Sequence, residues 1–539
     1  MSMRPITEVA AELDLGPAEL LPFGHHVAKL PLELLSRLGQ RRRGQLVLVS
    51  AITPTPAGEG KTTVSVGLAQ GLRRIGARAL AALREPSLGP VFGKKGGGTG
   101  GGRARLEPSD RINLHLTGDL HAITAAHNLL AAMVDAALYF GKHDLDARRI
   151  SWPRALDVND RALRNVVVGL GGSADGVPRE GSFAITAASE VMAILCLARD
   201  IADLKQRLGR ITVGLRKDKT RITAADVGAA GPMAALLYDA VLPNLVQTAE
   251  GGPALVHGGP FANIAHGCSS VMATQAALGL ADLVITEAGF GFDLGGEKFL
   301  HIKCPAAEVW PSVLVLVVTA RALRSHGSGD LAAGLDHLDH HVEAAAAFGL
   351  RPIIAINVRS DDAVADLTAL EAAAAARGLS CAQIHCFQDG GAGSEELARL
   401  VVAASKSTVA PAPAPTPRRL YALTDSIPDK LTAIARTMYG ARAIELGPEA
   451  RAALPDLAAA SVGDLPICVA KTNLSLSDDP RAIGRPRDHV LHVRALRAAT
   501  GAGHVLALCG DIMTMPGLPS QPAALGIDLA ADGSVTGLA

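Results

Sequence analysis

The sequence predicts an α/β protein in which a mostly parallel sheet carries a P-loop, accompanied by two smaller α/β domains. Hydrophobic residues make up 48% of the 539 residues and aromatic residues only 3%, so Ala, Val, Leu and Ile must build most of the core between helices and sheets. Short β-branched runs also alternate with helical patterns along the chain. Such alternation is typical of parallel strands covered by helices on both faces.

The first of these runs, Gln45 to Thr53, is followed by a Pro/Gly-rich turn and a helical pattern from Lys61 to Ile75. Further strands are expected at residues 79–83, 165–170, 211–215, 254–257, 282–286 and 313–318. Helices are expected between several of these strands, the longest at 187–208. We therefore assign residues 1–334 to a large N-terminal P-loop domain.

Two smaller α/β domains are expected after it. Residues 335–409 contain a strand at 352–358, an alanine-rich helix, a strand at 381–387 and a helix at 394–405. Residues 410–417 read A-P-A-P-A-P-T-P, which predicts a stiff, extended linker. The C-terminal α/β domain then occupies residues 418–539.

Charge and cysteine content exclude several classes of function. Lys plus Arg and Asp plus Glu each number 52, so no net field would collect nucleic acid or an anionic membrane. The seven cysteines show no C-x-x-C spacing, which argues against a disulfide framework and a zinc site and fits a reducing cytoplasm. The N-terminus lacks a signal peptide's apolar run, and the strongest apolar segment, 313–318, is too short to span a bilayer. We expect a cytoplasmic protein that acts on small molecules and binds neither nucleic acid nor membrane.

A phosphate-binding loop is indicated by T-P-A-G-E-G-K-T-T, in which Thr55 stands at the first glycine position of the P-loop pattern. Gly58 and Gly60 allow backbone N–H groups to turn toward a phosphate, and the following helix directs its positive end to the same place. Lys61 can then reach the β- and γ-phosphates, and the Thr62 hydroxyl can help to hold Mg²⁺. An ordinary glycine-rich turn with a surface lysine is the disfavoured alternative. The predicted nucleotide-binding residues are Thr55, Pro56, Ala57, Gly58, Glu59, Gly60, Lys61, Thr62 and Thr63.

Two further features should lie near this loop. Arg84 follows the strand at 79–83 and should emerge at the same edge of a parallel sheet, where it either clamps an anion or forms an ordinary salt bridge. Residues 93–103, G-K-K-G-G-G-T-G-G-G-R, either fold over bound phosphates or form a floppy surface loop, and the floppy loop is favoured.

Seven blocks of the sequence, taken in order, resemble formate–tetrahydrofolate ligase, and the resemblance runs from about residue 6 to the end of the chain. The blocks are the segment from Thr53 to Thr63, R-E-P-S-L-G-P-V-F-G from Arg84, I-N-L-H-L-T-G-D-L-H-A-I from Ile112, H-G-G-P-F-A-N-I-A-H-G-C from His257, E-A-G-F-G-F-D-L-G-G-E-K-F from Glu287, A-K-T-N-L-S-L-S-D-D-P from Ala470 and D-I-M-T-M-P-G-L-P from Asp511.

The resemblance implies that ATP, formate and tetrahydrofolate give ADP, phosphate and 10-formyltetrahydrofolate through formyl phosphate. It also implies Mg²⁺ with the ATP, a monovalent cation (K⁺ or NH₄⁺), a homotetramer, and a folate cleft to which residues 335–409 contribute. Formate is a poor acyl donor, and phosphorylation supplies a leaving group. Proximity and charge neutralisation would then provide most of the catalysis.

The resemblance also assigns roles to single residues. Lys61 would stabilise the transferring phosphoryl group, and Arg84 would bind formyl phosphate. Glu85 and Phe290 would line the cleft between nucleotide and folate. Three further candidates are His115, Asp119 and His121. They would either assist proton removal from the folate amine or orient the phosphate loop without contacting the substrates.

The chain departs from the family pattern at several positions. Arg359 stands near a position where the family has an aromatic residue that stacks on the pterin, and Phe387 stands where Trp is usual. Phe keeps a π-face and an Arg plane can also stack, so both stay predicted folate-binding residues with altered affinity. Ala184 replaces an acidic residue and Lys95 an aliphatic one, which bears on the monovalent cation and on loop closure.

Two other clusters are interpreted as structural. His337, His340 and His341 are expected on a solvated helix face rather than at a metal. Cys381 and Cys386 are expected in the core rather than as nucleophiles.

Two alternatives to the ligase stay open. The first is a P-loop NTPase switch or metallochaperone, which would need surfaces for a partner. The second is a non-catalytic or altered-specificity P-loop relative that binds folate or nucleotide, motivated by Arg359 and Phe387.

Overall fold

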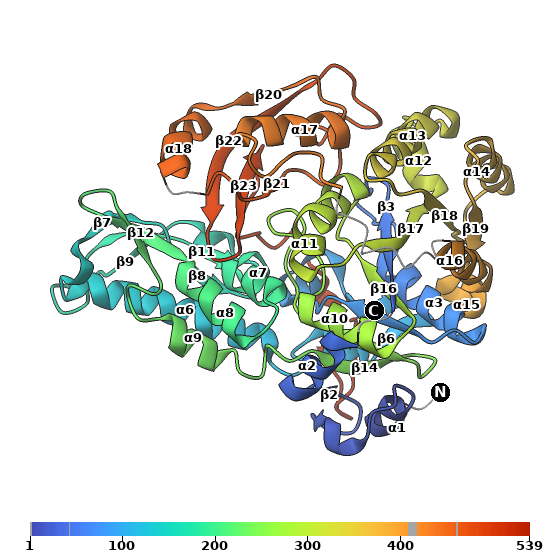
Figure 1. The fold of residues 1–539 in the computed structure, drawn as a ribbon, viewed down its shortest axis with the longest axis horizontal. Coiled ribbons are helices and arrows are strands. Elements are labelled where there is room, and N and C mark those ends of the chain that lie inside the picture. The colour runs from blue at the N-terminus through green and yellow to red at the C-terminus, as the bar shows by residue number, and fades with distance from the viewer. Residues whose placement is uncertain (1–2, 42–43, 408–417, 460–461, 539) are drawn as a thin grey trace.

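The computed structural model describes residues 3–41, 44–407, 418–459 and 462–538 (Figure 1). Its centre is a twelve-stranded sheet, which confirms the predicted α/β class with a large, mostly parallel sheet. Seven neighbouring strands of the sheet run parallel to one another. In spatial order they are β15 (Pro253–Val256), β4 (Ala79–Leu83), β16 (Leu283–Glu287), β3 (Gln45–Ala51), β17 (Pro311–Val318), β18 (Pro352–Asn357) and β19 (Cys381–Ile384). An antiparallel edge beyond β15 contains β14 (Asn244–Thr248), β2 (Ala28–Lys29), β1 (Leu21–Pro22), β6 (Ala104–Glu107) and β5 (Gly100–Gly101).

Side chains of the middle strand, β3, alternate between two cores, because successive residues of a strand point to opposite faces of the sheet. Leu46 and Leu48 join the larger core, which includes α10 (Val271–Leu280) and α13 (Leu331–Ala347). Val47 and Val49 join the other core, beneath α3 (Lys61–Arg74) and α16 (Glu395–Ser407). Helices on both faces therefore hold β3 rigidly, and the loop that follows it starts from a fixed point.

The strands of the predicted second unit continue this sheet. β18 pairs with β17, and β19 pairs with β18. The strand expected at 381–387 ends at Ile384, and the short helix α15 (Cys386–Asp389) follows it. The boundary placed near residue 334 thus falls between strands of one sheet, and the linker placed at 410–417 lies outside the described residues.

Two of the predicted strands form but do not join the parallel sheet, which corrects that expectation. β9 (Val166–Val168) pairs antiparallel with β10 (Arg179–Gly181) in a separate ribbon. β12 (Thr212–Arg216) pairs antiparallel with β13 (Arg221–Thr223) and with β7 (Leu145–Ile150). Both therefore belong to a side lobe that contains β7, β9, β10, β12 and β13 and lies on the left in Figure 1.

The long helix expected at 187–208 is also two helices, α7 (Glu190–Leu197) and α8 (Ile201–Arg210). Asp200 caps the second helix by accepting the backbone N–H of Asp203 over 2.8 Å. Such N-caps satisfy the free N–H groups of a new helix, so a second helix begins at this point.

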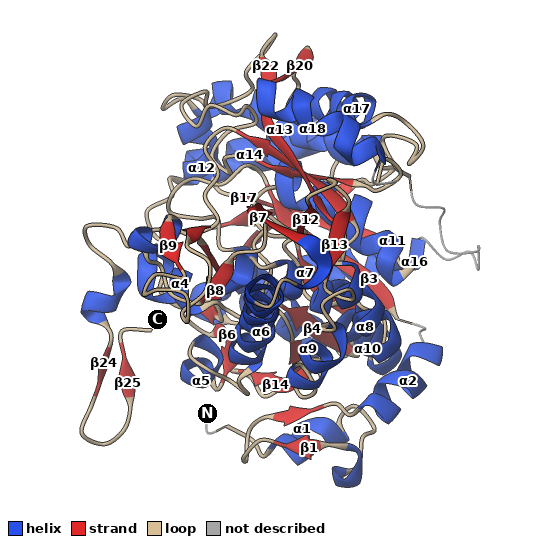
Figure 2. Ribbon diagram, turned by 90° about the vertical axis from the view of Figure 1, so that its left-hand side faces the viewer, coloured by secondary structure: helices blue, strands red, loops and turns tan. Residues whose placement is uncertain are grey.

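The C-terminal unit has its own sheet, in the order β20 (Ala443–Leu446), β22 (Val490–Ala499), β23 (His504–Cys509) and β21 (Ile467–Ala470). Helices α17 (Ile427–Tyr439) and α18 (Pro448–Ala459) lie beside it. After this sheet the chain returns to the large unit, where the backbone N–H of Ile185 donates to the Thr514 carbonyl over 2.8 Å. The final hairpin, β24 (Asp528–Leu529) with β25 (Val535–Thr536), projects from the body (Figure 2).

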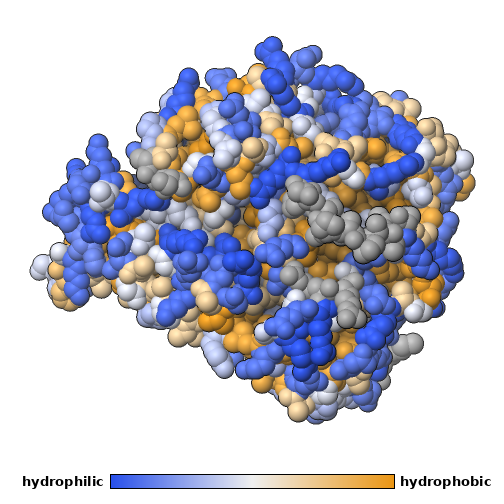
Figure 3. Space-filling model, in the orientation of Figure 1, coloured by the Kyte–Doolittle hydropathy of each residue, from blue (hydrophilic) through white to orange (hydrophobic). Residues whose placement is uncertain are grey.

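Among the described helices, α6 (Asp119–Tyr139) alone has the length and apolar composition of a membrane-crossing helix. A helix in the core of a folded protein passes the same test. α6 packs on α7 and on α9 (Ala230–Leu236) and carries a buried ion pair at its start. The face seen in Figure 3 is largely hydrophilic, with smaller hydrophobic areas between the polar residues.

Candidate active site

The predicted phosphate loop connects β3 to α3 at the carboxyl edge of the sheet. Gly58 and Gly60 have φ of 74° and 75°, a region that favours glycine. A Cβ on Gly60 would also lie 2.6 Å from Nδ2 of Asn357. The second glycine is therefore required both by backbone conformation and by space.

Glu59 fixes the loop from inside. Its buried carboxylate accepts hydrogen bonds from the Thr55 backbone N–H (2.8 Å), from Oγ1 of Thr55 (2.9 Å) and from Oγ1 of Thr319. Thr319 caps α12 (Ala320–His326) at the end of β17. The loop is thus tied to the neighbouring strand through one carboxylate.

Carbonyl groups of the loop are held from the other side. The Gly58 carbonyl accepts from Nη2 of Arg321 at 3.0 Å and from Nη2 of Arg359 at 3.1 Å. The Glu59 carbonyl accepts from Nδ2 of Asn357 at 2.9 Å. Because side chains occupy these carbonyls, the loop can turn its N–H groups toward an anion without rearrangement.

Lys61 and Thr62 begin α3 beneath this loop. Oγ1 of Thr62 donates to the Glu287 carboxylate at 3.0 Å, and Glu287 stands at the end of the neighbouring strand β16. Desolvation lowers the pKa of Lys61 to about 8; Lys95 and Arg84 add to this lowering, while Glu287 and Glu59 oppose it. Lys61 is partly exposed. It is therefore a cation that a bound polyphosphate would stabilise.

Arg84 leaves β4 at the same edge. Its Nη1 donates to the Pro260 carbonyl at 3.1 Å, and its Nη2 lies 3.8 Å from Oε1 of Glu287. Its buried Nε has no hydrogen-bond partner within the described part of the chain. The guanidinium therefore keeps hydrogen-bonding capacity for an anion, and Glu287 joins it to Thr62.

Glu85, the next residue, is buried, and neither of its carboxylate oxygens has a hydrogen-bond partner among the described residues. Burial raises its pKa well above the usual value, and the nearby Asp119 and Asp157 raise it further against the effect of Lys29. Burial likewise raises the pKa of Asp157 to about 6, although Oγ of Ser87 donates to that carboxylate at 2.8 Å. Two acids on this side of the site therefore have raised pKa values.

His115 and His121 are exposed and face each other, with 2.9 Å between Nδ1 of His115 and Nε2 of His121. Asp119 is buried instead. Its carboxylate pairs with Nζ of the fully buried Lys29 at 2.8 Å and accepts from Nδ2 of Asn244 at 2.8 Å. The two exposed imidazoles can therefore accept a proton from a bound substrate, whereas the Asp119 carboxylate is already paired with Lys29 and Asn244.

Phe290 follows Glu287 after β16 and has φ of 60°, a conformation rare for a large side chain. Such backbone strain persists only where the surroundings impose it, and it is concentrated at functional sites. Phe290 therefore lies at the same edge as Arg84 and the phosphate loop, in a conformation that the fold maintains.

The formate–tetrahydrofolate ligase family model matches residues 1–539. The chain belongs to this family. It is 56% identical to the formate–tetrahydrofolate ligase of Myxococcus xanthus over 550 aligned residues, which cover 100% of this chain and 99% of that protein. It is 51% identical to the enzyme of the same name from Paracoccus denitrificans, with 99% and 97% covered, and 50% identical to that of Maricaulis maris, with 100% and 98% covered.

Two residues that depart from the formate–tetrahydrofolate ligase pattern lie in different places. Arg359 directs its guanidinium to the Gly58 carbonyl, so it contacts the phosphate loop. Phe387, with 59% of its surface exposed, lies against Gly101, where an added Cβ would meet its ring at 3.0 Å. Their assignment to folate stays a prediction.

The glycine-rich stretch of this family member is a folded element. Gly100–Gly101 pairs with Ala104–Glu107 as a short hairpin, which in turn pairs with β14. Oδ1 of Asn113 accepts the Gly98 backbone N–H at 2.7 Å. The expectation of a floppy loop did not allow for these nonlocal partners.

The histidines expected on a solvated face are buried, so that prediction is wrong. His337, His340 and His341 are between 0% and 3% exposed, because the C-terminal unit covers them. Across the described ranges, no three His, Cys, Asp or Glu side chains are grouped to hold a metal ion. Cys386 is buried, as expected, and Cys381 is half-buried.

Sequence reasoning missed four residues that build the phosphate site: Glu287, Thr319, Arg321 and Asn357. Glu287, Thr319 and Asn357 stand at the carboxyl ends of strands β16, β17 and β18. The strands at 282–286 and 313–318 were expected in one parallel sheet, so the residues at their ends were a detectable signal, whereas the strand at 352–358 was assigned to a separate domain. Arg321 is the second residue of α12 and offered no such signal.

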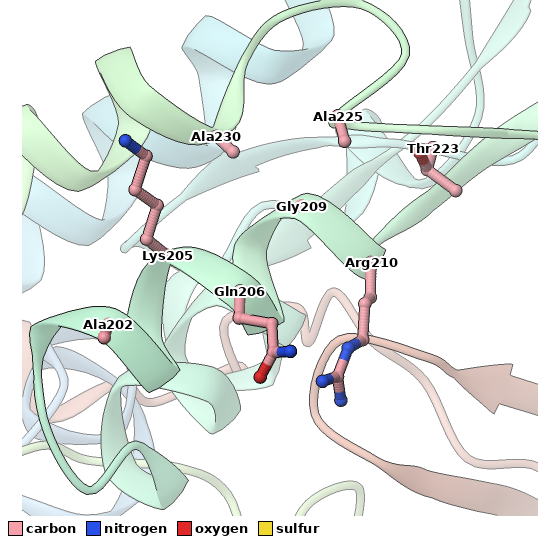
Figure 4. Close-up of a pocket in the computed structure, with 8 residues that line it drawn as sticks. All are labelled: Ala202, Lys205, Gln206, Gly209, Arg210, Thr223, Ala225 and Ala230. Atoms are coloured by element: carbon pink, nitrogen blue, oxygen red, sulfur yellow. The ribbon is translucent and has the colours of Figure 1, made fainter.

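A surface hollow lies beside α8 in the side lobe (Figure 4). Lys205 and Arg210 of α8 border it and project in different directions, with small residues between them. The lining residues are Ala202, Lys205, Gln206, Gly209, Arg210, Thr223, Ala225 and Ala230. None of the predicted site residues lines this hollow.

Proposed function

We propose that this chain is an ATP-dependent ligase that joins formate to tetrahydrofolate. One observation carries the proposal: Lys61, the Thr62–Glu287 pair and Arg84 meet at the carboxyl ends of three adjacent parallel strands, in a chain that belongs to this ligase family over its full length. Anion-binding groups from one sheet edge are what phosphoryl transfer to a carboxylate requires.

ATP would lie along residues 55–63, with its terminal phosphate between Lys61 and Arg84. Thr62 and Glu287 offer oxygen ligands that suit Mg²⁺, which would accompany the nucleotide and neutralise phosphate charge. Glu59, Thr319 and Asn357 would keep the loop in its binding conformation.

In the first step, a formate oxygen attacks the γ-phosphorus and the bond to the β-phosphate oxygen breaks, which releases ADP. Lys61 would balance charge on the transferring group, and Arg84 would hold the resulting formyl phosphate. In the second step, the N10 amine of tetrahydrofolate attacks the formyl carbon, phosphate leaves with the former formate oxygen, and the amine loses one proton. His115 and His121, which are exposed and mutually hydrogen-bonded, are the candidate acceptors of that proton.

Several further features belong to this proposal. The seven cysteines are all free, which supports a reducing cytoplasm. We also propose the homotetramer and the K⁺ or NH₄⁺ dependence on the strength of the family resemblance, and the three-domain division on the strength of the sequence pattern. Ala184, at the position where an acid is usual, is buried in β11 (Phe183–Ile185).

The deciding experiment supplies ATP, formate and tetrahydrofolate separately and together and measures ADP and 10-formyltetrahydrofolate. We expect both products in equal amounts, and only when all three substrates are present. ADP release that is indifferent to formate and folate would favour an NTPase switch. Calorimetric folate binding without turnover would favour a non-catalytic relative.

A further inference from the structure

Four buried histidines surround the point where β3 turns into the phosphate loop. His326 ends α12, and His337, His340 and His341 lie on α13. The proposed reaction uses none of them. Burial lowers the pKa of each ring, which keeps all four neutral near neutral pH.

Histidines hold Thr53 at both ends of its backbone. The hydrogen-bond ladder between β3 and β17 ends when the Ile52 N–H donates to the Val317 carbonyl at 3.2 Å. The next N–H, that of Thr53, donates to Nε2 of His341 at 3.0 Å, and the Thr53 carbonyl accepts from Nε2 of His326 at 2.8 Å. Because a backbone N–H can only donate, Nε2 of His341 must carry the lone pair.

Two of these histidines also hydrogen-bond to Gly484 of the C-terminal unit. The Gly484 N–H donates to Nδ1 of His326 at 3.2 Å, and its carbonyl accepts from Nδ1 of His337 at 2.9 Å. The rings of His326 and His337 are stacked, with centroids 3.9 Å apart. One nitrogen of His326 therefore bonds the phosphate-loop strand, and the other bonds a loop of the C-terminal unit.

A buried ion pair provides a second connection. Nζ of Lys471, in the C-terminal unit, lies 3.2 Å from Oδ2 of Asp293, and both side chains are nearly inaccessible to solvent. Oδ1 of Asp293 accepts from Oγ1 of Thr53 at 3.4 Å. These two connections from the C-terminal unit thus converge on Thr53.

We propose that His341 is a positioning residue for nucleotide binding, which fixes the entry of the phosphate loop by accepting the Thr53 N–H. Together with His326 it makes the C-terminal unit a support of that loop. The inference rests on the proposed nucleotide site at residues 55–63. Without this acceptor, a buried N–H would lack a partner, and it could regain one only if the loop moved.

Two amide variants of His341 distinguish a role as acceptor of the Thr53 N–H from a role in filling buried space. The side-chain oxygen of Gln reaches the position of Nε2, whereas that of Asn reaches only the position of Nδ1. His341→Gln therefore keeps the acceptor for Thr53, and His341→Asn loses it. His340→Leu is the matched control, because His340 is buried on the same helix but bonds the Met438 carbonyl at 2.9 Å instead of the loop.

Amide hydrogen exchange at residues 53–60 is measured on the full chain without nucleotide, and MgATP is then titrated by calorimetry. In His341→Asn we expect faster exchange and a dissociation constant for ATP that is about tenfold higher, with the other two variants within about twofold of the parent. If His341→Asn does not fold, His341→Met fills the space without an acceptor at Nε2 and carries the same expectation.

Unchanged exchange at the loop in the variant that lacks the acceptor would overturn the inference. Equal effects of His341→Asn and His340→Leu would also overturn it, since burial alone would then explain both. If the parent protein bound no ATP, the proposed function would fail, but the exchange comparison would still decide the role of His341.

Discussion

The two halves of the site differ in how their polar groups are paired. In the phosphate half, Thr53, Thr55, Gly58 and Glu59 have backbone or side-chain groups already engaged by neighbouring side chains. In the other half, Nε of Arg84 and both carboxylate oxygens of Glu85 are buried with no hydrogen-bond partner in the described structure. The unpaired buried atoms of the phosphate half, such as Nε of Arg321 and Arg359, lie instead on supporting side chains and not on the loop. A preorganised cradle thus stands beside groups that a ligand could still satisfy.

This difference indicates that the two halves contribute to binding in different ways. A paired loop needs no reorganisation when the nucleotide arrives, which is the condition for strong electrostatic stabilisation. Unpaired buried groups cost free energy until a partner arrives, so they favour binding of a small polar molecule at that place.

Replacing Lys61 should have the largest effect. Lys61→Ala removes the cation that the loop places at the phosphates, and we expect kcat to fall about 10²- to 10³-fold. Lys205→Ala serves as the control, because Lys205 is exposed in the side lobe, away from the predicted site residues, and should change kcat much less. Coupled assays of ADP release measure both. Similar losses in the two variants would contradict a special role for the preorganised half.

Replacing Arg84 should produce a smaller loss of activity, seen mainly in kcat/KM for formate. In Arg84→Ala we expect kcat/KM for formate to fall about 10²-fold, because a charge-assisted contact to the transferring group is lost. KM for ATP should change less than kcat/KM for formate, since Glu59, Arg321 and Arg359 hold the loop that binds the rest of the nucleotide independently of Arg84. Initial rates at varied formate and at varied ATP separate the two effects; a loss carried by KM for ATP alone would assign Arg84 to the nucleotide.

Glu85 tests the unpaired half through stability. Its folded-state pKa lies above the unfolded value of 4.5, so its contribution to stability is full below about pH 4.5 and is lost as the pH rises. Glu85→Gln removes this penalty, and we expect it to raise the free energy of unfolding by about 1 to 3 kcal/mol at pH 8. The gain over the parent should shrink toward pH 4.5 in denaturant titrations. A gain independent of pH would mean that folding does not shift the pKa of the Glu85 carboxyl.

The smallest expected effect is the uptake of a fraction of a proton. The pKa of Lys61 is lowered to about 8 in the free protein, so near that pH about half of the lysine is neutral. Bound triphosphate should restore the charge, with uptake of about half a proton at pH 8 and weaker ATP binding as the pH rises further. Calorimetry in two buffers of different ionisation enthalpy measures the uptake. Lys61→Met should abolish it.

Local patterns predicted much of the fold and of the phosphate site. The sequence from Gln45 to Ile75 contains its own strand, turn glycines and helix, so the loop could be located without knowledge of distant partners. Strand β4 was predicted at its observed bounds, and Arg84 emerges beside the loop because β4 and β16 are parallel neighbours of β3.

Nonlocal partners explain the errors. His337, His340 and His341 were expected to form a polar helix face. In the structure, His337 and His340 bond the carbonyls of Gly484 and Met438, and His341 accepts the backbone N–H of Thr53, all of which lie far along the chain. The strands at 165–170 and 211–215 could not be excluded from the parallel sheet, because their hairpin partners decide the pairing. Glu85 has no local signal for being unpaired, since its burial depends on the whole fold.

In the proposed reaction, formate is phosphorylated between Lys61 and Arg84 before the folate amine attacks it. The most direct test follows one oxygen atom, with formate labelled by a heavy oxygen isotope and mass analysis of the inorganic phosphate that is released. Formyl phosphate predicts that each phosphate carries one labelled oxygen, because the formate oxygen leaves with phosphorus. Unlabelled phosphate, formed at the same rate as 10-formyltetrahydrofolate, would contradict it.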